Sequence, residues 1–320
     1  MASGGLQVGV LLPTREAIFT GGSAAAPVLA MAERAEALGF DSLWVGDSLT
    51  ARPRFEPLTV LAAVAARTRR VSLGTAVLLP ALRNPVLLAH AVATVDRIAE
   101  GRLILGVGLG NKSAPSQAEF AAAGVPFEHR SGRLKELLAV CRALWTQERV
   151  THAGRFWNLR DVEVLPKPHR PGGPPVWVGG SGPLMMKLAA TDAQGWFPNM
   201  ADAAQLSSGW ERVGADARAA GRSRDAVALA FYCTVNLDPD ARRAGGALRE
   251  FVERYYGVPY AVISKHQGCF GGDAEGALAW LRPFLSSGVQ HVVLRFGGPD
   301  QAGQLESAGR DLLPRLKGAR

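Results

Sequence analysis

Cysteine is scarce in this sequence. The 320 residues include three, Cys141, Cys233 and Cys269, which lie far apart and form no C-x-x-C pair. An odd number of isolated cysteines argues against both a disulfide framework and a zinc site. No other spacing of residues suggests a metal site. We therefore expect reduced thiols, a cytoplasmic location and no bound metal.

Long apolar segments are also absent. No run approaches the roughly 20 residues that a helix needs to cross a bilayer, and the opening MASGGLQVGVLLP lacks the regions of a signal peptide. We therefore expect no membrane partner. The net charge of +8 is compatible with nucleic acid, although a compositional bias toward arginine also explains it. Because no basic run is interleaved with aromatic residues, we expect no nucleic-acid partner.

Short apolar runs, each followed by a helical pattern, fill the chain. With 48% hydrophobic and 20% charged residues, the composition is globular. Eight such units predict a (β/α)8 TIM barrel over residues 1–320 as a single domain, with a doubly wound open sheet as the alternative. The expected strands are Leu6–Leu12, Ser42–Asp47, Val71–Leu78, Arg102–Gly108, Val176–Gly180, Gly195–Asn199, Ala226–Leu237 and His291–Phe296.

Three segments do not fit the alternation and are expected to be insertions. They cover about residues 112–128, 150–168 and 238–268. The second has the turn residues of a hairpin. Because barrels of this kind carry their active sites on loops after the strands, we expect these insertions to shape a substrate pocket.

The stretch RLILGVGLGN, residues 102–111, has glycine at three alternate positions. A dinucleotide fingerprint needs G-x-G-x-x-G at the first strand–helix turn. Here the motif follows the fourth strand, and Asn111 stands where the third glycine is required. Two alternatives remain open. The glycines permit close packing inside a barrel, or they let a flat ring approach the backbone.

A second glycine cluster, GGSG, ends the fifth strand and opens a helix. It consists of Gly179, Gly180, Ser181 and Gly182. Backbone N–H groups at a helix N-terminus, beside a hydroxyl, suit a phosphate. An ordinary strand-to-helix turn is the alternative. If the turn binds phosphate, valine at Gly180 is expected to weaken binding and leave the fold intact.

These segments together resemble the luciferase-like flavin-dependent oxidoreductases, which include coenzyme F420-dependent reductases. The matching stretches are ALGFDSLWVGDSL, VSLGTAVLLPALRNPVLLAHAVATVDRIAEGRLILGVGLG, PVWVGGSGPLMMKLAATDAQGWF and GVQHVVLRF. The resemblance implies a (β/α)8 barrel that uses F420 or reduced FMN to transfer hydride to, or to monooxygenate, a small organic substrate. The basic charge favours F420, whose tail carries a phosphate and several carboxylates, although it also suits FMN.

The resemblance also implies roles for particular positions. Asp47 matches an acidic position near the pyrimidine side of the ring, and Ala76–Val77 matches a site that often has a non-proline cis peptide. The other implied cofactor contacts are Gly108, Gly110 and Asn111 near the ring or ribityl chain, Gly179, Gly180, Ser181 and Gly182 at the phosphate, and Trp196 and Phe197 along the tail.

The sequence departs from the family at two positions. The F420-dependent sugar-phosphate dehydrogenases have a histidine and a glutamate where this chain has Ser48 and Asn111. Sugar-phosphate oxidation is therefore not expected. Luciferase has a reactive cysteine on its fourth strand, and this strand has none, so light emission is not expected either.

Two further residues complete the expected site. His129 follows the fourth strand and is a candidate acid or base, and Arg295 ends the eighth strand, where a cation can meet an anionic tail or substrate. The implied partners are a small-molecule substrate, a second copy in a homodimer and a separate flavin or F420 reductase. The alternative function is a non-redox barrel that binds a phosphorylated ligand, or a flavin-storage protein. A Schiff-base aldolase is disfavoured because no expected strand contains lysine.

Overall fold

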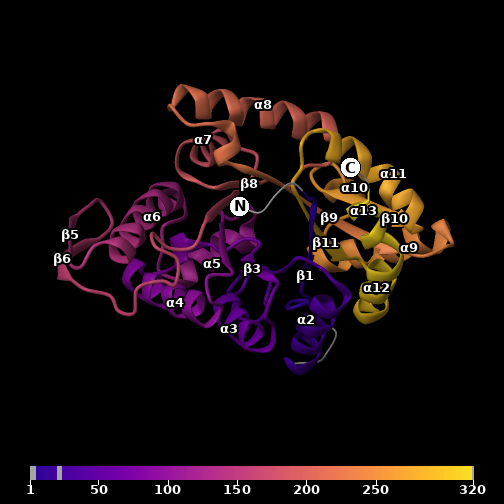
Figure 1. The fold of residues 1–320 in the computed structure, drawn as a ribbon, viewed down its shortest axis with the longest axis horizontal. Helices are drawn as coiled ribbons and strands as arrows, with labels where there is room; N and C mark the ends of the chain where they lie inside the picture. The colour runs from indigo at the N-terminus through magenta and orange to yellow at the C-terminus, as the bar shows by residue number, and fades with distance from the viewer. Residues whose placement is uncertain (1–4, 20–23, 319–320) are drawn as a thin grey trace.

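The computed structural model describes residues 5–19 and 24–318, and its core is a closed barrel of eight parallel strands. The strands lie in the middle of the molecule and the helices surround them (Figure 1). In ring order they are β1 (Gln7–Leu11), β2 (Ser42–Val45), β3 (Ser72–Thr75), β4 (Leu103–Val107), β7 (Val176–Gly179), β8 (Gly195–Phe197), β9 (Ala228–Leu237) and β11 (His291–Phe296).

The helices follow the strands in alternation, as the sequence predicts. The α-helices are α1 (Glu16–Phe19), α2 (Ala26–Leu38), α3 (Pro57–Arg67), α4 (Pro85–Ile98), α5 (Ala114–Ala122), α6 (Arg130–Thr146), α7 (Pro183–Asp192), α8 (Ala203–Ala219), α9 (Ala241–Tyr256), α10 (Tyr260–Ile263), α11 (Ala274–Ser286), α12 (Gln301–Ser307) and α13 (Leu313–Lys317). Short 3-10 turns η1 (Pro80–Leu82), η2 (Phe127–His129) and η3 (Arg224–Ala226) and a π-helical turn η4 (Ala308–Leu312) complete the described chain.

The barrel closes at two pairings. The last strand returns to the first, with His291 opposite Gln7, and β8 joins β9 with Gly195 opposite Ala228. An open doubly wound sheet would leave two edge strands instead, so that alternative is wrong. The expected strand Val71–Leu78 is shorter in the structure and ends at Thr75, immediately before a cis peptide bond between Ala76 and Val77.

A ninth parallel strand, β10 (Gly268–Gly272), was not expected from the sequence. It pairs with the second half of β9, from Cys233 to Leu237, outside the barrel. Its sequence, GCFGG, contains three glycines and no apolar run, so it carries no strand signal. The third expected insertion contains α9 and α10, and the chain returns from it along β10.

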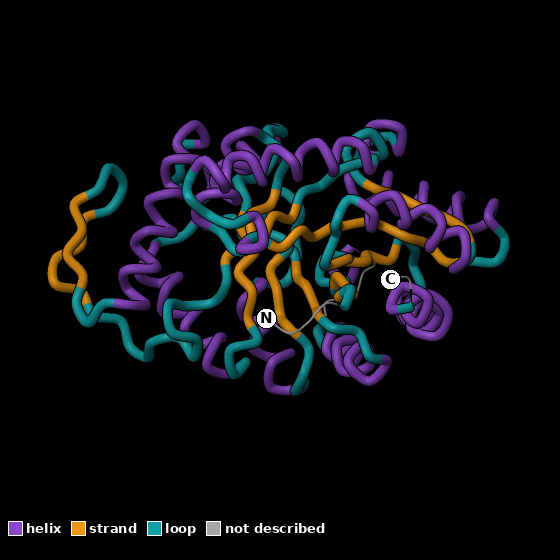
Figure 2. The backbone as a smooth tube through the Cα atoms, turned by 45° about the horizontal axis from the view of Figure 1, so that its top comes forward, coloured by secondary structure: helices purple, strands orange, loops and turns teal. Residues whose placement is uncertain are grey.

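The other expected insertions also have secondary structure. Residues 112–128 contain α5, and residues 150–168 contain an antiparallel hairpin of β5 (Val150–Ala153) and β6 (Asn158–Val162). The hairpin projects from one side of the molecule (Figure 2). Glu136 of α6 anchors its turn by accepting hydrogen bonds from the backbone N–H groups of Phe156 and Trp157.

Aromatic side chains fill the interior of the barrel below the carboxyl ends of its strands. The ring centroids of Trp44 and Trp177 lie 5.3 Å apart, and that of Phe197 lies 5.1 Å from Trp44. Gly74 and Gly195 leave the space that the indoles occupy, because a Cβ would lie 2.2 Å from Trp44 and 2.5 Å from Trp177. The barrel is therefore closed below, and chemistry is confined to the carboxyl ends of the strands.

His291 lies in this interior and predicts a pH dependence of stability. Its Nε2 lies 2.6 Å from Ser42 Oγ, which also accepts a hydrogen bond from Trp44 Nε1. Burial lowers the pKa of His291 to about 3, against about 6.5 in an unfolded chain. The unfolded state alone takes up a proton between these values. The free energy of unfolding should therefore fall as the pH drops below about 6.5, by up to about 1.4 kcal/mol per pH unit.

Urea unfolding at several pH values checks this expectation. Between pH 6.5 and 4.5 the wild type should lose about 2 kcal/mol more than the variant His291→Gln, which has no proton to take up. Parallel pH profiles for the two proteins would show that this imidazole does not couple to folding.

Candidate functional site

The carboxyl ends of the barrel strands carry side chains of unequal size. Ala76 and Val77, after β3, and Tyr232, on β9, pack above the inner aromatic cluster. On β11, Arg295 takes the next inward position after Val293. The side of the mouth formed by β3, β4 and β7 thus has small residues, and the side formed by β9 and β11 has a phenol and a guanidinium.

Val77 explains two of the glycines near the mouth. A Cβ at Gly108 would lie 2.5 Å from Val77 Cγ2, and one at Gly179 would lie 2.9 Å from Val77 Cγ1. Both glycines therefore make room for Val77. The close-packing alternative therefore accounts for Gly108, and partly exposed Val77 lies beside it. Contact between Gly108 and a ring stays a prediction. The peptide Ala76–Val77 is cis, as the family resemblance implies.

Asn111 and Gly110 shape the turn after β4. Asn111 Oδ1 accepts hydrogen bonds from Ser113 N at 3.0 Å and from Ser116 Oγ at 2.7 Å, so it organises the start of α5. Gly110 has φ +74°, which favours glycine. Cofactor contact by either residue stays a prediction.

Asp47 holds the segment that follows β3. Its Oδ2 accepts a hydrogen bond from Leu79 N at 2.8 Å and pairs with Arg83 Nη1 at 2.6 Å, and its side chain is 1% exposed. The carboxylate therefore fixes the loop after β3 in the described structure. The expected position of Asp47 near a pyrimidine ring stays a prediction. Because its carboxylate is bound to Leu79 and Arg83, Asp47 would act on such a ring through the segment that these residues belong to.

Ser48 also has a structural partner. Its hydroxyl donates to Glu119 Oε1 at 2.6 Å, and the same oxygen accepts from the backbone N–H groups of Leu49 and Thr50 at 2.5 and 3.0 Å. Glu119 belongs to α5 and is buried. The loop after β2 is thus fastened by a carboxylate 71 residues away. Nothing in the sequence marks Glu119, because the first insertion shows no pattern that places it.

The turn between β7 and α7 exposes backbone donors. Gly182 is the N-cap of α7 and supplies no side-chain hydrogen bond, as is also the case at α2 and α6, whereas Glu56 caps α3 and Asn84 caps α4. Pro183 at the first helical position has no N–H, and Met185 N donates to Gly182 O at 2.9 Å. The donors left at this end of the helix are the N–H groups of Leu184 and of the exposed residues Ser181 and Gly182. A Cβ at Gly182 would meet no atom within 4 Å. This turn has the donors and the open approach that a phosphate requires.

Gly180 cannot serve as the test position that the sequence suggested. It has φ +95°, a conformation that valine rarely adopts, so valine there would strain the turn instead of leaving the fold intact. Trp196 is also reassigned. It is fully buried outside the barrel, its Nε1 donates to Gly180 O at 2.9 Å, and it supports the turn from behind instead of lining a cofactor tail. Phe197 points inward and contributes to the floor of the mouth.

His129 lies apart from the inner cluster. It ends η2 and is the N-cap residue of α6, and its ring centroid is 5.7 Å from that of Phe156 in the hairpin. Within residues 5–19 and 24–318 its ring has no hydrogen bond or ion pair. A catalytic role for His129 stays a prediction.

Tyr232 was missed by the sequence analysis. Its ring packs edge-on against Phe197 at 6.4 Å, and it keeps partial exposure. Burial raises the pKa of the Tyr232 phenol well above its ordinary range, so the hydroxyl stays protonated near neutral pH. The available signal was a phenol at an inward position of the apolar run AVALAFYCTVNL.

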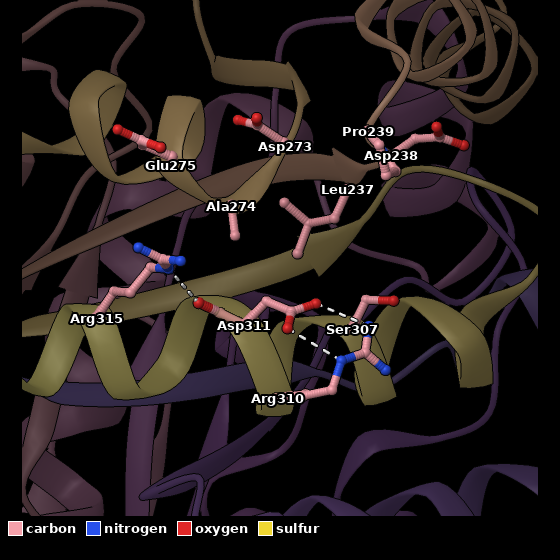
Figure 3. A pocket seen from close by; sticks show the side chains of 10 residues that line it. All are labelled: Leu237, Asp238, Pro239, Asp273, Ala274, Glu275, Ser307, Arg310, Asp311 and Arg315. Atoms are coloured by element: carbon pink, nitrogen blue, oxygen red, sulfur yellow. Dashed lines mark hydrogen bonds and ion pairs between the residues drawn. The ribbon is translucent and has the colours of Figure 1, made fainter.

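A surface hollow of about 270 Å³ lies outside the barrel, between the end of β9, the start of α11 and the turn η4 (Figure 3). Three of its carboxylates form a helix cap or ion pairs. Asp273 caps α11, Asp311 pairs with Arg310 at 2.7 Å, and Asp238 pairs with Arg243. No group of three or more metal-ligating side chains occurs in the described part of the chain, and none of its helices could span a membrane. The hollow therefore offers no chemistry comparable with the mouth.

The fold and the mouth define a class of (β/α)8 barrel oxidoreductases. The chain belongs to the luciferase-like monooxygenase family, whose model matches residues 6–284. It is 31% identical over 314 residues to the F420-dependent glucose-6-phosphate dehydrogenase of Intrasporangium calvum, covering 89% of this chain and 93% of that protein.

Two solved structures share the fold. An F420-dependent secondary alcohol dehydrogenase, solved with an F420-acetone adduct, superposes with a TM-score of 0.83 at 23% identity over 98% of this chain and 99% of that one. A monooxygenase from Streptomyces bottropensis gives a TM-score of 0.80 at 23% identity over 97% and 99%.

Proposed function

We propose that this chain transfers hydride between F420 and a small organic substrate. The observation that carries the proposal is the uncapped GGSG turn at the N-terminus of α7, in a chain whose curated relative at 31% identity is named F420-dependent. The residues present fit such a cofactor. The turn offers donors for a phosphate, and the bulge at Ala76–Val77 offers an apolar surface for a ring.

The protein's part is to bind, orient and shield. Backbone N–H groups of Ser181 and Gly182 would hold the phosphate, and Val77 and Phe197 would support the ring from below. F420 supplies the hydride donor or acceptor, and the chain supplies the pocket and the proton chemistry. The Tyr232 hydroxyl is placed to donate a proton to a substrate oxygen, which compensates for the absent histidine and glutamate at Ser48 and Asn111.

Equilibrium titration with F420, FMN and reduced FMN tests the proposal. Binding should quench or shift the absorbance or fluorescence of F420 at micromolar concentrations, with weaker effects for FMN. If none of the three binds at tens of micromolar, the proposal is wrong. If only reduced FMN binds, the chain belongs with the monooxygenases, the second function that the fold permits.

A substitution at Gly182 tests the phosphate site. Gly182→Val should weaken F420 binding by about 10- to 100-fold, because the side chain enters the space in front of the helix donors. The fold should be unchanged, since φ is −72° and no atom lies within 4 Å of the new Cβ. Gly5→Val, equally free of neighbours but remote, is the matched control. Equal affinities in the two variants would remove this turn from the site.

Several expectations remain predictions of this proposal. They are a homodimer, a separate F420 or flavin reductase as partner, a cytoplasmic location and one barrel domain over residues 1–320 with the three insertions. A flavin-storage protein or a non-redox phosphate-binding barrel is not favoured, because the curated relative is named as a dehydrogenase. A storage protein would bind F420 and oxidise or reduce no substrate.

A further inference from the structure

Arg295 has donors that nothing in the described chain accepts. It lies on β11 at the mouth, and its side chain is 1% exposed. Nη1 donates to the hydroxyl of Tyr256 at 3.3 Å, whereas Nε and Nη2 have no partner. Buried guanidinium groups are normally hydrogen-bonded, because an unpaired buried charge is costly.

Aromatic rings surround the guanidinium. Its Cζ lies 4.1 Å from the ring centroid of Tyr255 and 5.2 Å from those of Tyr256 and Phe251. Such contacts stabilise the cation through the faces of the rings. They leave the in-plane donors Nε and Nη2 unused, and this edge of an arginine matches the two oxygens of a carboxylate. Both atoms are covered in the structure, so a carboxylate reaches them only when the packing around the guanidinium opens.

The neighbourhood has an excess of positive charge. Arg295, Arg54 and Arg15 all interact electrostatically with the buried carboxylate of Glu16, and Arg54 also interacts with Asp47. Arg54 donates a hydrogen bond to the hydroxyl of Tyr255 at 3.2 Å, so the acceptor is a phenol and not a carboxylate. Asp47, the next carboxylate, is paired with Arg83. Within the described residues Arg295 itself makes no ion pair, and two of its donors have no acceptor.

Arg295 is also separate from the phosphate turn. It belongs to β11, opposite Thr234 in register, and three strand-to-strand steps around the ring separate β11 from β7. Tyr232, opposite Val293, lies one inward position below it. An anion on Arg295 therefore stands beside the proposed proton donor and away from the turn that receives the cofactor phosphate.

We propose that Arg295 receives a carboxylate of the substrate, so that the reacting carbon lies near the Tyr232 hydroxyl. The substrate class is then a carbonyl or alcohol compound that carries a carboxylate within a few bonds of the reacting carbon. Tyr256, held by Gln267 at 2.6 Å, positions the guanidinium. This inference rests on the proposed hydride transfer, and it adds the chemistry that selects the substrate.

Calorimetric and thermal-shift titrations of the F420-loaded protein with carboxylate probes test it. Acetate, butyrate and benzoate are the probes, and their amides are the neutral controls. We expect at least one carboxylate to bind and its amide not to bind. Arg295→Gln should lower the affinity for that carboxylate by about 10- to 100-fold. Arg295→Lys keeps the charge but lacks the planar guanidinium, so its affinity should lie between those of the wild type and Arg295→Gln. Arg310→Gln, at an exposed arginine, should change nothing.

The outcomes separate the two proposals. Binding of F420 without binding of any carboxylate overturns the inference and leaves the proposed function standing. Equal carboxylate binding by wild type and both Arg295 variants also overturns it. If Arg295→Lys weakens F420 but not a deazaflavin without the phosphate and carboxylate tail, Arg295 serves the cofactor instead. Failure of the wild type to bind F420 overturns the proposed function itself.

Discussion

Phenylalanine at position 232 should lower kcat about 100- to 10,000-fold, the range that a positioned proton donor contributes. The hydroxyl is the only difference between the side chains, and the ring keeps its edge-on contact with Phe197. Burial raises the pKa of this phenol, so the group is present as the acid at working pH. The loss should appear in kcat, with little change in KM or in F420 affinity.

The measurement starts from a screen of ketones, aldehydes and oxo acids as oxidants of reduced F420, followed by the absorbance of the oxidised cofactor. The best substrate then serves for Tyr232→Phe and for the control Tyr260→Phe, which alters a partly exposed phenol on α10. The proton-donor role is contradicted if both variants keep kcat within about threefold of the wild type.

Alanine at position 119 should lower the free energy of unfolding by about 2–4 kcal/mol. Glu119 Oε1 accepts from the Ser48 hydroxyl and from the N–H groups of Leu49 and Thr50. Removing the carboxylate leaves these donors without an acceptor beneath α5. Glu128→Ala, at an exposed glutamate of the same insertion, should change the value by no more than about 0.5 kcal/mol.

Urea unfolding of both variants at pH 7 gives this comparison. A stability of Glu119→Ala equal to that of Glu128→Ala would mean that water replaces the carboxylate at no cost. The same samples give the F420 affinity, which reports whether the loop after β2 contributes to the cofactor site.

Periodicity was sufficient to predict the barrel. Buried parallel strands are continuous apolar runs, so the eight barrel strands are visible in the sequence within a few residues. The hairpin and the GGSG turn between β7 and α7 were also predictable, because both depend on local turn residues. The glycine-rich strand β10 was not, because its formation depends on β9 offering free backbone groups and not on its own composition.

The features that the sequence does not reveal depend on contacts between distant segments. The sequence does not show that Val77 fills the space above Gly108, or that Trp196 faces away from the mouth. It gave no reason to notice Glu119, whose partners are 71 residues away at Ser48. Alternation predicts which way a strand residue points, and applied to β9 it would have identified Tyr232.

The length of β9 has a consequence for how this protein can change. Its second half pairs with β10 on one side while Cys233 to Val235 still pair with β11 on the other. Leu237, where the third insertion departs, therefore lies directly opposite Gly272, where it returns. A segment whose two ends are neighbours can be exchanged with little effect on the closure of the remaining chain. The segment between them carries Tyr255 and Tyr256, which cover Arg295. The segment can therefore be exchanged as a unit, which would change the residues around Arg295 while the eight-stranded barrel is kept.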